Sequence, residues 1–352
     1  MRTFTSVLIA GLLAAAPVWA QHTAPASAGP NPDSPDYHEL TLAIEEKGTL
    51  YHSVKLTKTE TRNGSVKVSG SDTRYRNDFV LGDDGYAVKK TVISTVITLP
   101  DGQKIDDKST SPEAVLMRNI IGSVSEMNFV ADESLSPVRI ENWPALRDRS
   151  KAAVLEAVKV AAKSANEKVP DEVVQTLTQV FDSVLGKLSS EQAAELYLKV
   201  DTLMALPHNV GLERNKPLAG EGTVNVPIGN YPMTMREAIT LTEWNPERNS
   251  ARLTYSYSPS PESLKAFFTD FMPRMLKQMG APEKAIQEMQ DALSKDTTGV
   301  FDMSTLCNYD MAIDTGLVRK GTCTQTTTVS MAGENMKKVE AYEFSESLTP
   351  QN

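Results

Sequence analysis

Two periodicities divide this chain, and their order limits the folds open to it. Apolar and polar residues alternate with a period of two over most of 37–141 and 220–345, whereas 144–206 repeats apolar residues at helical spacing. Leu253, Tyr255 and Tyr257 alternate with polar neighbours, which is typical of an antiparallel sheet with one exposed face. We therefore expect an α+β fold with a curved, mainly antiparallel, half-barrel-like sheet. The N- and C-terminal strands form this sheet, and the mid-chain helices pack on one of its faces.

Turn signals separate the expected strands of the N-terminal part. Asn63-Gly64 predicts a type I′ hairpin turn, because both residues tolerate a positive φ. The runs Gly-Asp-Asp-Gly at 82–85 and Pro-Asp-Gly at 100–102 are also typical of tight turns. Ser111 and Pro112 then open a short helix that extends to about Ile121.

Helices are expected in two places. The insertion at about 144–207 contains three amphipathic helices, and the third begins with a capping box formed by Ser189 and Gln192. A helical pair covers about 262–293, and Pro273 should kink or interrupt its first member.

The N-terminus resembles a secretory signal peptide. Arg2 precedes a short apolar run, and Val18-Trp19-Ala20 fits a cleavage site, so residues 1–20 should be removed near Ala20/Gln21. Residue 21 is not cysteine, which argues against a lipoprotein anchor. We expect a disordered leader over 21–36, a single domain over 37–345 and a flexible tail over 346–352. The protein should be periplasmic or secreted.

The two cysteines are expected to form a disulfide within a hairpin. Asp314-Thr315-Gly316 predicts a three-residue loop that pairs Ile313 with Leu317. Counting outward along both strands from that pair brings Cys307 opposite Cys323. In an oxidising compartment, cysteines placed in this way form a bond.

Composition excludes several functions. The net charge of −9, without a basic cluster, argues against nucleic-acid binding, and no apolar run is long enough to span a membrane. The chain contains no nucleotide-binding glycine motif, no clustered metal ligands and no G-x-S-x-G motif, so we predict no cofactor, no metal site and no catalytic residue. A dispersed triad built on His52 or His208 remains open, because triads are defined by geometry.

The most suggestive segment for binding is rich in Phe and Met. Flexible methionine side chains adapt to varied partners, and a bent helix of this composition could close over an apolar cavity. Simple coverage of a core is the commoner role of such a helix. The candidate ligand-binding residues are Phe267, Phe268, Phe271, Met272, Met275, Met279, Tyr255 and Tyr257.

Three functions follow, in this order. The first is a non-enzymatic, soluble envelope protein that binds an apolar small molecule or lipid between sheet and helices. The second is a protein-interaction or assembly factor with an envelope protein as partner. The third is a hydrolase with a dispersed site.

Overall fold

The computed structural model describes residues 29–106, 108–109, 112–164, 185–226, 231–278, 301–331 and 334–350, with short pieces within 174–182 and 282–291. The chain forms two compact units. Unit 1 contains 1–42, 56–68 and 207–343, and unit 2 contains 43–55, 69–206 and 344–352. The predicted signal peptide lies outside the described residues. The expectation of a single domain over 37–345 stays a prediction.

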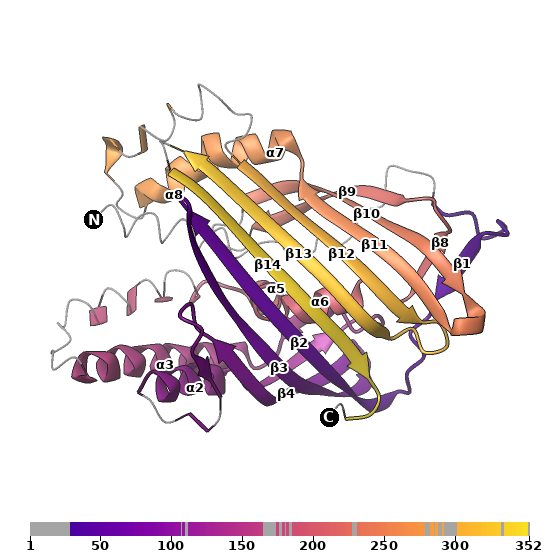
Figure 1. The fold of residues 1–352 in the computed structure, drawn as a ribbon, viewed down its shortest axis with the longest axis horizontal. Coiled ribbons are helices and arrows are strands. Elements are labelled where there is room, and N and C mark those ends of the chain that lie inside the picture. Colours follow the sequence, from indigo (N-terminus) through magenta and orange to yellow (C-terminus); the bar gives the residue numbers. More distant parts are fainter. Residues whose placement is uncertain are drawn as a thin grey trace. The chain divides into compact units, whose positions relative to one another are not determined.

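Unit 1 is dominated by long antiparallel strands that follow one another in the sheet in the order β14, β13, β12, β11, β10 and β9 (Figure 1). A separate antiparallel pair is formed by β1 and β8. The bounds are β1 Tyr37–Leu40, β8 Val210–Glu213, β9 Leu218–Val226, β10 Tyr231–Asn245, β11 Ser250–Pro259, β12 Phe301–Ala312, β13 Val318–Met331 and β14 Glu334–Ser347. Its helical elements are the 3-10 helix η1 (Pro246–Arg248), α7 (Pro261–Ala266), the π-helix η2 (Phe267–Phe271) and α8 (Met272–Gln278).

Unit 2 has strands in the order β7, β6, β4, β3 and β2, with β5 paired to β4. The strands β2, β3 and β14 each have residues in both units. The bounds are β2 Lys47–Arg62, β3 Ser65–Gly82, β4 Gly85–Thr98, β5 Lys104–Ile105, β6 Glu126–Ala131 and β7 Pro137–Ile140. Its helices are α2 (Pro112–Ser123), α3 (Trp143–Ser164), α5 (Ser190–Tyr197) and α6 (Lys199–Ala205).

The prediction of a mainly antiparallel α+β fold is confirmed at this level. Each strand pairing whose register is described runs antiparallel. The expected turns are also present: β2 and β3 meet at Asn63 and Gly64, which have φ of 48° and 83°, and Gly82 pairs with Gly85 at the β3–β4 turn. Among the described residues, no helix combines the length and apolar character needed to cross a membrane.

The cysteine hairpin confirms the predicted disulfide but corrects the predicted turn. Ala312, not Ile313, pairs with Leu317: the Ala312 N–H donates to the Leu317 carbonyl over 2.9 Å. That one-residue offset alone would misalign the cysteines. A register shift between Asp310 and Met311 compensates for it, and Cys307 again lies opposite Cys323, to which it is bonded. Gly316 has the expected positive φ of 68°.

The helices of the insertion at about 144–207 agree only in part with the prediction of three amphipathic helices. Helix α3 and the capping box at Ser189 and Gln192 are present. The predicted third helix is split into α5 and α6 at Leu198, whose φ of −111° and ψ of 21° are not helical. Most of the predicted middle helix, and most of the second member of the pair at 262–293, lie outside the described residues.

Alternation along the strands builds the core of each unit. In β3 of unit 2, Tyr75, Asn77 and Phe79 are buried while Arg76 and Val80 are exposed. In β11 of unit 1, Ala251, Leu253, Tyr255 and Tyr257 are buried on one face. Helix α5 packs against β7, and Trp143 at the start of α3 donates its indole N–H to the Leu188 carbonyl over 3.0 Å. Each unit therefore has one buried sheet face.

Removing the disulfide should lower stability moderately. The bond spans a sequence separation of 16, and a loop of about 15 residues contributes about 3 kcal/mol in the chain-entropy description. The turn and strand ladder already restrict this hairpin, so we expect Cys307→Ala/Cys323→Ala to lose about 1–3 kcal/mol of unfolding free energy in urea titrations. Equal stability of the variant and the parent protein would show that the bond adds no constraint.

Candidate functional site

The Phe- and Met-rich helix of unit 1 is attached to the sheet at its first turn. Ser260 caps α7 by accepting a hydrogen bond from the Ser263 N–H over 3.1 Å, and Pro261 takes the first helical position. The backbone N–H of Ser260 donates to the Thr234 carbonyl, and the Thr234 N–H donates to the Ser263 hydroxyl, each over 2.8 Å. Strand β10 therefore positions the start of this helix.

The same helix changes its hydrogen-bond pattern in the middle. Residues of η2 form a π turn, in which the Met272 N–H bonds to the Phe267 carbonyl. Pro273 follows directly, and it has no N–H to donate. One residue later, the Arg274 side-chain Nε donates to the Asp270 carbonyl over 2.8 Å. The expected interruption at Pro273 is thus a π turn, and such turns are frequent at functional sites.

An aromatic cluster surrounds this turn. The Tyr231 ring of β10 lies 4.8 Å from Phe271 and 5.6 Å from Phe267, and Phe267 lies 5.1 Å from Phe271 and 4.9 Å from Phe268. Phe267 and Phe268 are buried, whereas Tyr231 and Phe271 are half-exposed. Burial, with a smaller contribution from Asp270, raises the pKa of the Tyr231 hydroxyl. The cluster forms a continuous aromatic path from the surface into the core of unit 1.

The other predicted ligand residues have different surroundings. Met272 is buried, Met275 belongs to α8, and Met279 lies outside the described residues. Tyr255 and Tyr257 are buried on β11, the neighbour of β10, with ring centroids 6.3 Å apart. The Tyr255 hydroxyl donates to Glu237 Oε2 over 3.2 Å, and burial raises the pKa of Tyr255 far above its ordinary value. The sheet side of this predicted site is therefore partly polar.

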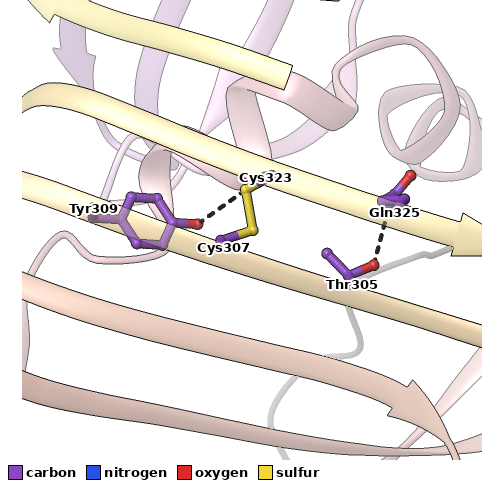
Figure 2. Close-up of a disulfide and its surroundings, with 5 residues drawn as sticks. All are labelled: Thr305, Cys307, Tyr309, Cys323 and Gln325. Atoms are coloured by element: carbon purple, nitrogen blue, oxygen red, sulfur yellow. Dashed lines mark hydrogen bonds between the residues drawn. A yellow bond between two sulfur atoms is a disulfide. The ribbon is translucent and has the colours of Figure 1, made fainter. Parts of the chain in front are cut away.

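The buried disulfide adjoins this polar region. Figure 2 shows the Tyr309 hydroxyl directed at Cys323 Sγ, 3.8 Å away, and the Gln325 amide donating to the Thr305 hydroxyl over 3.1 Å. Both bonds join β12 to β13, as does the disulfide. Across the sheet, Thr305 is opposite both Gln325 and Tyr257, and Tyr257 is opposite Glu237. A polar row thus crosses four strands of the buried face.

Unit 2 contains a second candidate site, a buried ionic cluster under helix α6. Asp201 of α6 is 4% exposed and accepts hydrogen bonds from the Lys90 ammonium of β4 over 2.5 Å and from the Asn77 amide of β3 over 3.3 Å. The Lys90 ammonium also lies 3.8 Å from the centre of the Tyr75 ring. One carboxylate therefore attaches α6 to two strands.

His52 and Glu346 extend this cluster along the same face. The His52 ring stacks on Tyr75 with centroids 4.7 Å apart, and its Nδ1 lies 3.8 Å from Glu346 Oε1. Burial, followed by the charge and hydrogen bond of Asp201, raises the pKa of Tyr75 well above its ordinary value. Tyr75 therefore keeps its proton across the physiological pH range and does not act as a base there. Within the described part of the chain, no three His, Cys, Asp or Glu side chains are placed to hold a metal ion.

Sequence reasoning missed the residues that complete both sites. Tyr231, Met233 and Met235 occupy alternate positions of the chain, so the sequence already indicated that they share one face of a strand. Asn77 falls between Tyr75 and Phe79 on the buried face of β3, which is also visible in the sequence pattern. No local pattern connects Lys90 with Asp201, because the two lie far apart in the chain.

Comparison with known proteins gives no family. No family model matches the chain, and no curated protein matches it. Among solved structures, it is similar to lipovitellin, from a study of lipid–protein interactions, with 6% identity over 88% of this chain and a TM-score of 0.40. The match covers 26% of the lipovitellin chain.

Two further matches are weaker. DynF, from the dynemicin biosynthesis pathway of Micromonospora chersina, shares 7% identity over 95% of this chain and 94% of its own, with a TM-score of 0.20. OpdQ of Pseudomonas aeruginosa shares 7% identity over 86% of this chain and 99% of its own, with a TM-score of 0.22. Matches at these levels carry no argument about function.

Breaking the buried ion pair should destabilise the protein strongly. Lys90→Met leaves Asp201 buried and without its cation, which costs about 3–5 kcal/mol of unfolding free energy. The double variant Lys90→Met/Asp201→Asn removes the buried charge and keeps an acceptor for Asn77, so most of the loss should be recovered. Urea titrations of both variants test this, and a double variant as unstable as Lys90→Met would contradict it.

Helix α5 should also make stability depend on pH. Burial, with a smaller contribution from Glu191, raises the pKa of Glu195 to about 7. Between the ordinary value and about pH 7, the folded state holds a proton that the unfolded chain releases, so stability falls as pH rises. Glu195→Gln should remove this decline in urea midpoints measured from pH 5 to pH 8. Glu156→Gln, an exposed change on α3, is the matched control, and an unchanged slope in Glu195→Gln would refute the assignment.

Proposed function

We propose that this protein is an exported, non-enzymatic binding protein of the cell envelope. In this proposal, unit 1 shelters an apolar small molecule or the acyl chain of a lipid between its sheet and the helix formed by α7, η2 and α8. The sheet acts as the curved, half-barrel-like wall of the site, and the helix acts as its cover.

The aromatic path through Tyr231, Phe271 and Phe267 is the observation that carries the proposal. Two half-exposed rings lie against a buried one, so an apolar ligand can leave water at the surface and make continuous aromatic contact inward. Aromatic side chains are typical of the lining of small-molecule sites.

The π turn supports a moving cover. Where the helix passes from α7 to η2 and α8, the regular bonding pattern is interrupted and Pro273 removes one donor, so this is the place where the helix bends most easily. The first turn stays attached to β10 through Ser260 and Ser263. Residues after the π turn can therefore move outward while α7 remains in place.

Two features support a location outside the cytoplasm. The Cys307–Cys323 bond is formed and buried, and such structural bonds persist in oxidising compartments. The signal-peptide pattern of residues 1–20 supports the same location.

A second candidate function, binding of an envelope protein, rests on exposed aliphatic side chains. Val66 and Val68 of β3 and Leu306 of β12, all in unit 1, are 59%, 47% and 54% exposed. Exposed apolar residues gathered in one patch mark protein contacts, whereas isolated ones are ordinary. The aromatic path remains the stronger observation, because it joins the surface to the core.

Ligand retention tests the proposal directly. The protein is purified from the periplasm under gentle conditions, and native mass spectrometry is expected to show a bound lipid or apolar molecule. Phe271→Lys places a charge among aromatic rings at a half-exposed position, so it should lower retained ligand and binding of N-phenyl-1-naphthylamine by about tenfold while the disulfide still forms.

Leu306→Lys is the matched control, because it adds the same charge at an exposed position of β12. It should leave binding of the probe unchanged. Ligand-free parent protein that also fails to bind the probe would overturn the proposal, and co-purification of a stoichiometric protein in place of a lipid would favour the second function.

A further inference from the structure

Unit 2 has a hollow on the sheet face opposite its buried core. Its volume is about 640 Å³, which lies within the range of small-molecule sites. Phe79 points to the buried side, and the neighbouring Asp78 and Val80 therefore point to the other side. The hollow is lined by Lys47, Gly48 and Thr49 of β2, Asp78, Phe79 and Val80 of β3, Ala87, Val88 and Lys89 of β4, Asn128 of β6, and Glu141.

Side-chain length explains why this surface is hollow. Thr49, Val80 and Ala87 are short and occupy the middle strands, whereas longer side chains stand around them. Val80 pairs with Ala87 across the strands, so the floor has an apolar centre, and Val80 is 46% exposed. An apolar floor that is open to solvent within a polar rim is an incomplete surface that a ligand can cover.

A row of polar groups runs beside this floor. Asp78 pairs with Lys89, and Lys89 pairs with Asn128 in the next strand. The Thr49 hydroxyl donates to Asp78 Oδ1 over 2.7 Å, which adds β2 to the same row. Strands lie about 4.8 Å apart, so the row from β2 to β6 is about 14 Å long. Hydroxyl, carboxylate, ammonium and amide groups therefore follow one line across the hollow.

Both charged groups in this row, Asp78 and Lys89, already have ion-pair partners. Asp78 Oδ2 lies 3.2 Å from Arg76 Nε, and the Lys89 ammonium lies 3.0 Å from Glu126 Oε1. Lys47 and Glu141 differ, since neither forms an ion pair with any residue that the structure describes. The Leu81 N–H donates to the Glu46 carbonyl, which places Lys47 beside the floor on the β2 side. The Glu141 N–H donates to the Asn128 carbonyl, which places Glu141 at the other end.

We propose that this hollow binds a short peptide with free termini, of about three to four residues. Its carboxylate pairs with the Lys47 ammonium and its amino group with the Glu141 carboxylate, because these opposite charges stand at opposite ends. Its backbone amides meet the polar row, and small apolar side chains rest on Val80 and Ala87. Lys47 and Glu141 stand four strand spacings apart, about 19 Å, and four residues of extended chain, about 13 Å, span this with an ion pair of about 3 Å at each end. This site is separate from the aromatic path of unit 1, and its existence does not depend on the function proposed above.

Titration calorimetry with tetra-alanine tests the proposal on the full mature protein. Binding should be saturable, and acetylation of the amino terminus or amidation of the carboxyl terminus should each weaken it about twofold to fivefold, the range of an exposed ion pair. Lys47→Glu and Glu141→Lys should each weaken it further, because each replaces an attraction with a repulsion.

The double variant Lys47→Glu/Glu141→Lys should bind the peptide again, in the reverse direction, because it restores complementary charges. Lys320→Glu makes the same charge change at an exposed position of unit 1 and should bind like the parent protein. Absence of saturable binding, equal binding of the doubly blocked peptide, or a double variant no better than either single one would overturn the proposal. Circular dichroism of each variant confirms that the fold is kept.

Discussion

The alternation of side chains along the strands is the constraint on which both units depend. In a strand, a slip of one residue exchanges the buried face for the exposed face. The C-terminal hairpin shows how closely this register is kept. Its turn closes one residue earlier than the sequence pattern suggests, and a register shift between Asp310 and Met311 restores the pairing of Cys307 with Cys323. The disulfide and the Gln325–Thr305 bond then join β12 to β13 in that register.

In unit 2, polar groups on the buried sheet face influence the position of helix α6. A buried ion pair such as Lys90–Asp201 generally adds little net stability compared with apolar residues of similar size, because both charges lose water when buried. In the structure, Asp201 reaches Lys90 and Asn77 together, so a displaced α6 would leave a buried charge without its partners. The cluster therefore selects a position for the helix, and it does so with groups whose removal is costly.

The two proposed binding sites use opposite kinds of surface. In unit 1, the aromatic path joins half-exposed rings to a buried core next to an interrupted helix, an arrangement suited to an apolar ligand. In unit 2, the hollow lies on the open face of the sheet, with charges at its ends and an apolar floor, which suits a short dipolar chain. The two kinds of surface arise from the alternation of side chains along the strands, because each strand directs one face to the core and the other to solvent.

The sequence by itself determined the order of elements, the mainly antiparallel sheet, the turns at Asn63-Gly64 and Gly82–Gly85, the capping box at Ser189 and the pairing of the cysteines. These features depend on the periodicity of apolar residues, on the residues that favour tight turns and on helix capping, which are local properties of the chain. Three features appear only in the tertiary structure, because neither periodicity nor turn chemistry specifies them. They are the break at Leu198, the register shift near Asp310 and the form of the interruption before Pro273, a π turn.

The candidate sites also contain some residues that the sequence indicated and others that only the tertiary structure brought together. Phe267, Phe268 and Phe271 were visible as an apolar stripe, which indicates the burial of Phe267 and Phe268, whereas Phe271 is half-exposed. Three features were decided only by the tertiary structure: the contacts of Tyr231 with Phe267 and Phe271, the Lys90–Asp201 pair, and the hollow between Lys47 and Glu141. Their members come from different strands and helices, and the distance between two side chains in a fold bears no simple relation to their separation in the chain.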